Sequence, residues 1–343
     1  MFVKRILLGS LLLVVVMIFA LVACGNGGNQ GETYEVKISH VVSESDDVHL
    51  GFVKLKEMLE EKSDGRFNVN IYSNAALAAS DDEQAELVNS DSVQIACVAA
   101  YNIANLNSNL LKFNVLDLPY LFETDEDYYK FIDSDAGKEL FASVLDETGN
   151  VWAQANYIRS WQALTTTKKP ARVPSDLKGK SILCGSPEVF RKTVEAWGGN
   201  VGTVAWSETY TAMQQGSVDG NLRAINLSIT QRFYEVQKYC TLVNQSAMVN
   251  TTLVSKSWYD SLPEDLQAIF DECMLEYEQI MRDYGVARQN TTIQELKDNG
   301  VEVIELTDAE KAEWVEAAKP VWDAMEATVG ADLIQTAKDI VGK

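Results

Sequence analysis

The spacing of apolar residues divides the first third of the chain into alternating strands and helices. Residues 34–39 and 67–71 alternate apolar and polar side chains, which is typical of half-buried strands. Residues 93–99 are small and apolar apart from Gln94, as in a strand that is buried on both faces. Between the first two strands, Phe52, Leu55, Met58 and Leu59 mark one face of a helix. This order predicts βαβ units around a mainly parallel sheet.

A second set of α/β elements follows residue 150. Strands are predicted to begin at 151–157 and to cover 181–184 and 248–255, with a helix near 187–197. A helical pattern then keeps one apolar face from Pro263 to about Leu296. At 1.5 Å per residue that helix is on the order of 50 Å long, so we expect it to bridge two domains. A capping box from Thr307 to Glu310 opens the C-terminal helices.

The N-terminus has the pattern of an export signal. Lys4 and Arg5 precede an apolar run, residues 6–22, and a small residue stands before Cys24. A cysteine at this point completes a lipobox, so we predict a signal peptide over 1–23 and a lipidated Cys24 with a flexible tether over 24–32. A transmembrane helix is the alternative, but no stop-transfer charges follow the apolar run.

Composition narrows the function classes. The chain has 29 basic and 50 acidic residues. The only charged residues lost with the predicted signal peptide, 1–23, are Lys4 and Arg5, so the rest of the chain is strongly acidic. A strongly acidic surface argues against binding nucleic acid or anionic lipid. With His40 and His49 as the only histidines, no nucleophile elbow and no phosphate-binding loop, we expect no enzyme activity, metal or cofactor. Four further cysteines allow three disulfide pairings, but their apolar surroundings favour reduced core thiols: Cys97, Cys184, Cys240 and Cys273.

Several short motifs occur in the order found in one known family. The chain contains Ser-Glu-x-Tyr-x-Ala-x-Gln-x-Gly-x-Val-Asp-Gly, in which Ser207 is a plausible helix N-cap and Gly216 suits the position after the helix. The other motifs span 61–65, 116–122, 174–179, 233–238 and 262–267. Together they resemble the solute-binding proteins of TRAP (tripartite ATP-independent periplasmic) transporters, in the dicarboxylate-binding DctP family.

The resemblance implies a periplasmic-binding-protein-like α/β fold with two lobes, an interlobe ligand cleft and a long helix that spans both lobes. It assigns 33–155 plus 246–285 to lobe I and 156–245 plus 286–343 to lobe II. It also implies an extracytoplasmic protein that passes a small molecule to the small and large membrane subunits of a transporter driven by an ion gradient. A ligand-sensing lipoprotein that reports to a membrane kinase is an alternative.

The chain departs from the family where the ligand is expected. Leu183 and Gln162 stand at positions where the family usually has arginines that hold a substrate carboxylate. Arg223 stands where the family has an asparagine facing the ligand, so its guanidinium is predicted to compensate, unless it pairs with a surface acid. Trp206 falls at an aromatic position over the ligand, with a plain core tryptophan as the alternative.

Other candidates fall at expected strand ends or at ligand-facing positions of the family. They are His40, Tyr101, Asn102, Arg159, Trp161, Ser186 and Asn250. The first-choice ligand is a monocarboxylate or another small anion held by Arg223. The alternative is a neutral or heteroaromatic solute, such as a nucleoside, stacked on Trp206.

Overall fold

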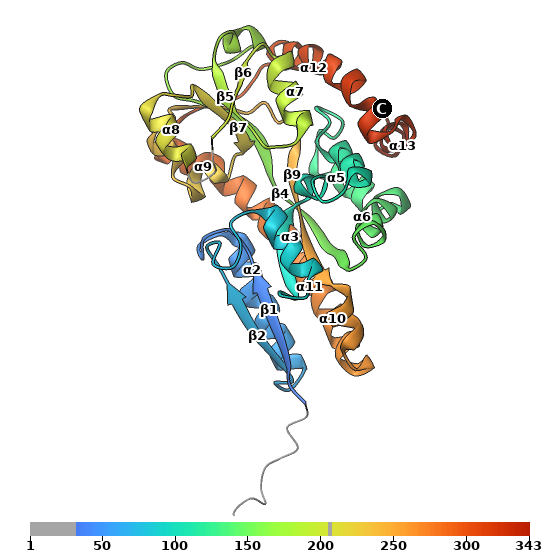
Figure 1. Cartoon of the computed structure of the whole chain (residues 1–343). Coiled ribbons are helices and arrows are strands. Elements are labelled where there is room, and N and C mark those ends of the chain that lie inside the picture. Colours follow the sequence, from blue (N-terminus) through green and yellow to red (C-terminus); the bar gives the residue numbers. More distant parts are fainter. Residues whose placement is uncertain (1–31, 205–207) are drawn as a thin grey trace, which may run out of the picture.

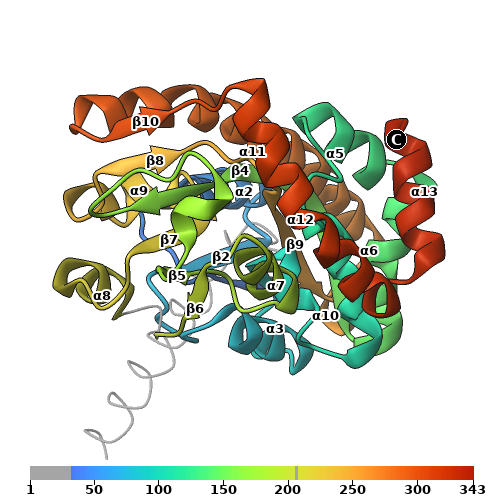
Figure 2. The same cartoon turned by 90° about the horizontal axis from the view of Figure 1, so that it is seen from above.

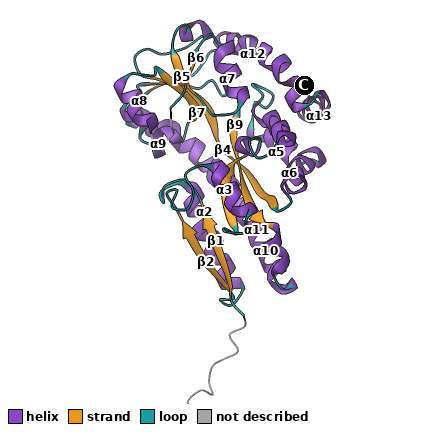
Figure 3. Ribbon diagram, in the orientation of Figure 1, coloured by secondary structure: helices purple, strands orange, loops and turns teal. Residues whose placement is uncertain are grey.

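The computed structural model describes residues 32–204 and 208–343, and its strands form one continuous ladder in the order β2-β1-β3-β9-β4-β7-β5-β6, with β8 paired to β4 and β10 paired to β8. The strands are β1 (Tyr34–Ser39), β2 (Phe67–Tyr72), β3 (Ile95–Ala99), β4 (Val151–Thr166), β5 (Ser181–Leu183), β6 (Asn200–Gly202), β7 (Gly220–Ala224), β8 (Tyr239–Thr241), β9 (Ala247–Ser255) and β10 (Glu302–Ile304). In Figure 3 these strands run from one end of the molecule to the other, with helices on both sides.

Helices connect and cover these strands. They are α2 (Asp47–Lys62), α3 (Asp81–Asn89), α4 (Ala100–Ile103), α5 (Asp125–Ile132), α6 (Asp135–Thr148), α7 (Glu188–Ala196), α8 (Thr209–Gln215), α9 (Leu227–Thr230), α10 (Lys256–Ser261), α11 (Glu264–Asp298), α12 (Asp308–Val329) and α13 (Ala331–Val341). Short 3-10 helices add η1 (Ser108–Asp117), η2 (Pro174–Leu177) and η4 (Phe233–Glu235).

The first lobe is built as the N-terminal pattern predicts. Strand β1 lies between β2 and β3, parallel to both, and α2 and α3 make the two connections. All five residues of β3 are buried, in agreement with the continuous apolar run. The apolar face of α2, including Phe52, Leu55 and Leu59, packs in the core under β1 and β2. Figure 1 shows this group at the lower end of the molecule.

The second lobe repeats the arrangement with shorter strands. Strand β5 lies between β6 and β7, parallel to both, and α7 connects β5 to β6. Helix α8 ends at Gly216, whose φ of 70° is the left-handed conformation that glycine adopts without strain. That helix end is confirmed, whereas the N-cap predicted at Ser207 lies outside the described residues.

Strands β4 and β9 join the two lobes. Residues Val151 to Trp161 of β4 pair with β9, and residues Gln162 to Thr166 pair with β7. The predicted strand therefore begins where expected but continues to Thr166. Bulges interrupt the β4–β9 register between Gln154 and Asn156 and again between Ile158 and Ser160. These bulges bend the ladder where it passes from one lobe to the other.

The long helix predicted after Pro263 is α11, with 35 residues and a length of about 52 Å. It packs against α2 in the first lobe, along β4, and against α9 and β10 in the second lobe. Figure 2 shows it passing beneath α12 along the molecule. The helix passes close to β4 at Gly285, where a Cβ atom would lie 2.2 Å from the carbonyl oxygen of Ile158. Only glycine leaves room for that contact.

The C-terminal helices do not follow the predicted lobe boundary. Helix α12 contacts both α7 and η1, and α13 packs on α5 and α6. The Lys343 ammonium donates to the carbonyl of Tyr120 at 2.7 Å. The assignment of 286–343 as one piece of lobe II is therefore corrected for α13, because α12, about 33 Å long, carries the chain across to the other side.

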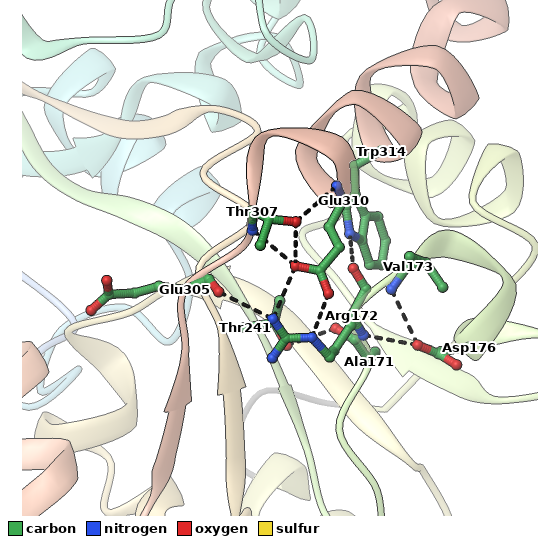
Figure 4. A network of polar contacts seen from close by, with 9 residues as sticks. All are labelled: Ala171, Arg172, Val173, Asp176, Thr241, Glu305, Thr307, Glu310 and Trp314. Atoms are coloured by element: carbon green, nitrogen blue, oxygen red, sulfur yellow. Dashed lines mark hydrogen bonds and ion pairs between the residues drawn. The ribbon is translucent and has the colours of Figure 1, made fainter.

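A polar network anchors the start of α12 to the second lobe (Figure 4). The predicted capping box is present, because Thr307 accepts from the Glu310 backbone and the Glu310 carboxylate accepts from the Thr307 backbone. Glu310 also accepts two hydrogen bonds from Arg172, at 2.5 and 2.9 Å. The indole of Trp314 donates to the Arg172 carbonyl at 2.8 Å. The helix start is thus tied to the segment before η2.

The four cysteines expected to be core thiols are free and buried. Within 32–204 and 208–343, every helix is too short or too polar to cross a membrane. The predicted signal peptide and Cys24 lie outside the described residues.

Candidate functional site

A cavity of about 670 Å³ lies between the two lobes. Its lining comes from the carboxyl ends of β1, β3, β5 and β6, from the crossing strands β4 and β9, and from β7 and α9. Carboxyl ends of parallel strands meet at one edge of a sheet, which is where open α/β sheets bind ligands. The topology therefore brings together residues that are far apart in the sequence.

The cavity has two opposing walls. The first wall belongs to the first lobe and the crossing strands, and its polar residues include His40, Asp81, Tyr101, Asn102, Arg159 and Asn250. The second wall belongs to the second lobe and includes Leu183, Ser186, Arg191, Arg223 and Thr230. Eight sequence candidates line this cavity: His40, Tyr101, Asn102, Arg159, Leu183, Ser186, Arg223 and Asn250.

Three candidates do not line it. Trp206 lies outside the described residues. Gln162 is buried beside Arg223 and Met248 at a separate small void. Trp161 was expected to face the cleft, but its indole donates to the Asp125 carboxylate at 2.7 Å and packs edge-on against Tyr128.

The second bulge of β4 explains the position of Trp161. It pairs Ser160 with Met248 and Trp161 with Ala247. Cross-strand partners share a face of the sheet, and successive residues alternate between faces. Since Met248 lines the cavity, Ser160 shares its face and Trp161 points to the opposite one.

Arg223 reaches the cavity from β7 and is half-buried. Its Nη2 donates to the carbonyl of Cys184 at 2.8 Å, which fixes the guanidinium beside the loop after β5. Leu183 lines the same wall, but it also packs in a small apolar core with Met213 and Phe233. The second wall therefore presents a cation next to an apolar surface.

Side chains of the two walls touch each other within the described residues. The ring of Tyr101, from α4, meets the ring of Phe190, from α7, edge-on at 5.4 Å between centroids. Ser186 donates to the side-chain oxygen of Asn102 at 3.5 Å. Burial raises the pKa of Tyr101 to about 12, so its hydroxyl keeps its proton at neutral pH.

A buried ion pair supports the first wall. Arg159 and Asp46 are 6 % and 1 % exposed, and their side chains meet at 2.5 Å. Although burial disfavours its charge, the Asp46 carboxylate raises the pKa of Arg159 above its usual value. Asp46 also caps α2 by accepting from the Val48 backbone at 3.0 Å. The charge of Arg159 is thus largely balanced before any ligand arrives.

His40 is 1 % exposed and stacks on Phe52 with 5.8 Å between centroids. Its Nε2 lies 3.1 Å from Nδ1 of His49. Burial, and then the neighbouring imidazole of His49, lower the pKa of His40 to about 4. The ring is therefore neutral at physiological pH.

Sequence reasoning missed Asp81 and Arg191. Asp81 is interpretable from sequence only as an acid in the first turn of a helix, whereas here its Oδ2 accepts from the Ala99 backbone at 2.9 Å and from Asn102 at 2.8 Å. Burial raises the pKa of Asp81, against the effect of those two hydrogen bonds. Arg191 lies near the start of α7, the helix that follows β5, and that position is the signal that could have found it. Among the described residues, no group of three or more His, Cys, Asp or Glu is placed to hold a metal ion.

Comparison with known proteins identifies the family. The sequence profile of "Bacterial extracellular solute-binding protein, family 7" (DctP) matches residues 38–328. The C4-dicarboxylate-binding periplasmic protein DctP of Rhodobacter capsulatus is 30 % identical over 312 residues, which cover 90 % of this chain and 91 % of that protein.

Solved structures agree with the sequence match. A TRAP periplasmic solute-binding protein of Shewanella oneidensis with bound succinate has a TM-score of 0.83 at 25 % identity, covering 90 % of this chain and 99 % of that one. A homologue from Desulfovibrio salexigens with bound orotic acid has a TM-score of 0.81 at 25 % identity, with the same coverage of both chains. On the profile, the relative and the shared two-lobe fold, this chain belongs to the DctP family of TRAP solute-binding proteins.

Proposed function

We propose that this protein captures a small organic carboxylate in the interlobe cavity and delivers it to a TRAP transporter. One observation carries the choice of an anion. The whole chain has 50 acidic and 29 basic residues, yet once Arg159 is paired with Asp46 the described cavity lining still has two further arginines, Arg191 and Arg223, against one aspartate, Asp81. A cationic cavity in an acidic protein concentrates anionic ligands and favours their binding.

Arg223 is the proposed anchor for the carboxylate. Arg159 is balanced by Asp46, and Arg191 is exposed at the rim of the cavity. Arg223 is half-buried and held in place by the Cys184 carbonyl, in a setting where a guanidinium can bind a carboxylate with two parallel hydrogen bonds. The relatives solved with succinate and orotic acid support a carboxylate, because both ligands carry that group.

The transport step and the membrane anchor are also proposals. Membership of the family supports delivery to a small and a large membrane subunit, with uptake driven by an ion gradient. The lipobox supports lipidation of Cys24. The lipid would anchor the protein to the cell membrane, in the periplasm or on the outer face of the cytoplasmic membrane. Cys24→Ser should move the protein from the membrane fraction to the soluble fraction, whereas a protein that stays with the membrane would contradict lipid anchoring.

Calorimetric titration with a panel of organic acids and nucleosides tests the ligand class. Arg223→Leu should weaken binding of the preferred acid about thirtyfold, which corresponds to roughly 2 kcal/mol. Arg223→Lys should lose less, since it keeps the charge without the fork. Arg232→Leu is the matched control, because Arg232 is exposed and pairs with Glu235. Tight binding of a neutral solute that survives Arg223→Leu within about threefold would overturn the anion proposal in favour of a neutral or heteroaromatic ligand.

A further inference from the structure

The first wall of the cavity holds two side chains whose oxygens can accept a hydrogen bond from a ligand. On the first wall, Asn250 is 3 % exposed, and its side-chain oxygen Oδ1 has no hydrogen-bond partner among the described residues. Its Nδ2 is already engaged, donating to the Sγ of Cys97 at 3.3 Å. A buried acceptor that faces a cavity without a partner is costly unless a ligand supplies the donor. Asn250 therefore indicates a ligand with an N–H or O–H group.

Asp81 adds a second acceptor to the same wall. Both hydrogen bonds that it receives from the described residues, from the Ala99 backbone and from Asn102, end on Oδ2. Neither bond uses Oδ1, and Asp81 lines the cavity. The amide nitrogen of Asn102 uses one of its two N–H donors in that contact.

By formal charge this wall has one more acid than base. Asp46 and Arg159 form a buried pair, and Asp81 adds a second carboxyl group, which forms no ion pair within the described residues, although the charge of Arg159 acts to lower its pKa. His40, which also lines this wall, is neutral. A ligand carboxylate placed here would meet a like charge and would leave the acceptors of Asp81 and Asn250 without donors.

The second wall supplies donors instead. Arg223 and Arg191 carry guanidinium groups, which only donate hydrogen bonds, and Ser186 and Thr230 add hydroxyl groups. A carboxylate fits this wall by charge and by hydrogen bonding. One ligand that spans the cavity must then be an acid at one end and a donor at the other.

We propose that the ligand is a monocarboxylate whose far end carries a hydroxyl or ammonium group bound by Asp81 and Asn250, and that dicarboxylates bind more weakly. This inference rests on the proposed carboxylate-binding function. It differs from what the name of the Rhodobacter capsulatus relative states for that protein. It also assigns Asp81 and Asn250 as the residues that determine specificity.

Matched acids that differ only at the far end test the proposal. The four-carbon set is 4-hydroxybutanoate, 4-aminobutanoate, butanoate and succinate, and the corresponding six-carbon set covers a longer span of the cavity. Protein purified after expression of the full chain is titrated with each acid. In at least one set, the hydroxy or amino acid should bind about tenfold more tightly than the unsubstituted acid, with the dicarboxylate weakest.

The variant Asp81→Asn replaces one acceptor by a donor at constant size. It should reduce the preference for the donor-bearing acid over the unsubstituted acid to within about twofold and strengthen dicarboxylate binding. Asp82→Asn is the control, because Asp82 is exposed and its side chain accepts a hydrogen bond from Asn105 at 3.3 Å. Asn250→Leu, which removes the second acceptor, should lower the same preference and gives an independent test if Asp81→Asn does not fold.

The possible outcomes distinguish a failure of this inference from a failure of the proposed carboxylate-binding function. If carboxylates bind but dicarboxylates bind most tightly, and the variants leave the order unchanged, the donor-end inference fails and the carboxylate function stands. If no acid binds while a neutral solute does, both fail. The inference is supported if both variants lower the preference for the donor-bearing acid while butanoate binding is kept. A merely structural role would weaken the binding of all acids alike.

Discussion

The two walls of the cavity are built in different ways. The first wall stands on long, buried strands and is held by an internal ion pair between Arg159 and Asp46. The second wall is built from strands of three to five residues and short helices, and its Arg223 is positioned by a backbone carbonyl. The first wall is therefore fixed by an ion pair between two side chains, whereas Arg223 of the second wall is fixed by a backbone carbonyl. This comparison teaches that the group that positions each arginine, a carboxylate or a carbonyl, matters as much as the number of arginines.

Breaking the ion pair of the first wall should have the largest effect. Arg159→Leu leaves the Asp46 carboxylate buried without its cation, which is expected to cost roughly 3–5 kcal/mol of unfolding free energy. Urea unfolding of the variant and the parent measures the loss. Arg232→Leu removes an exposed pair and should cost less than about 1 kcal/mol. Equal losses in the two variants would show that the Arg159 pair has no special role.

Acid should weaken the first wall through His40. The pKa of His40 in the folded protein, about 4, lies below its ordinary value of 6.5. Between these two values the His40 imidazole is protonated in the unfolded chain but not in the folded chain. The unfolding free energy therefore falls as the pH drops from 6.5 toward 4. The loss is roughly 3 kcal/mol for this residue. Unfolding free energies at pH 7 and pH 4.5 should therefore differ less in His40→Gln than in the parent, and an unchanged difference would contradict this assignment.

The smallest effect should come from Trp161. Because its indole lies on the face away from the cavity, Trp161→Phe should change ligand affinity by less than about twofold. The lost hydrogen bond to Asp125 should lower the unfolding free energy by about 1 kcal/mol. Titration and urea unfolding of the same preparation compare the two quantities. A tenfold loss of affinity with unchanged stability would return Trp161 to the ligand site.

Much of the fold could be predicted because its signals are local. The alternation in β1 and β2, the apolar face of α11, the capping box at Thr307 and the glycine that ends α8 each depend on neighbours within a few residues. The family resemblance added the two lobes and the cleft, since its motifs extend over most of the chain.

The site was less predictable because its contacts are remote and depend on register. Arg159 meets Asp46 across 113 residues, and no local pattern marks that pairing. The bulge beside Ser160 reverses the face of Trp161, whereas an uninterrupted strand would keep it beside Arg159. Asp81 resembles any acid in a first helical turn until the fold places β3 and α4 next to it. The crossing of α12 likewise depends on partners that lie far away in the sequence.

The contact between Gly285 and the carbonyl of Ile158 offers a way to tune this protein from a distance. Ile158 lies between the two β4 bulges, at the passage from one lobe to the other, and outside the cavity lining. One added methyl group at position 285 must push the long helix away from the strand by about an ångström or more to restore an ordinary van der Waals separation. Gly285→Ala would thus alter the spacing of the lobes while leaving every cavity side chain unchanged in identity. Ligand affinity could then be changed through the packing of helix α11 on strand β4, without changing any residue that lines the cavity.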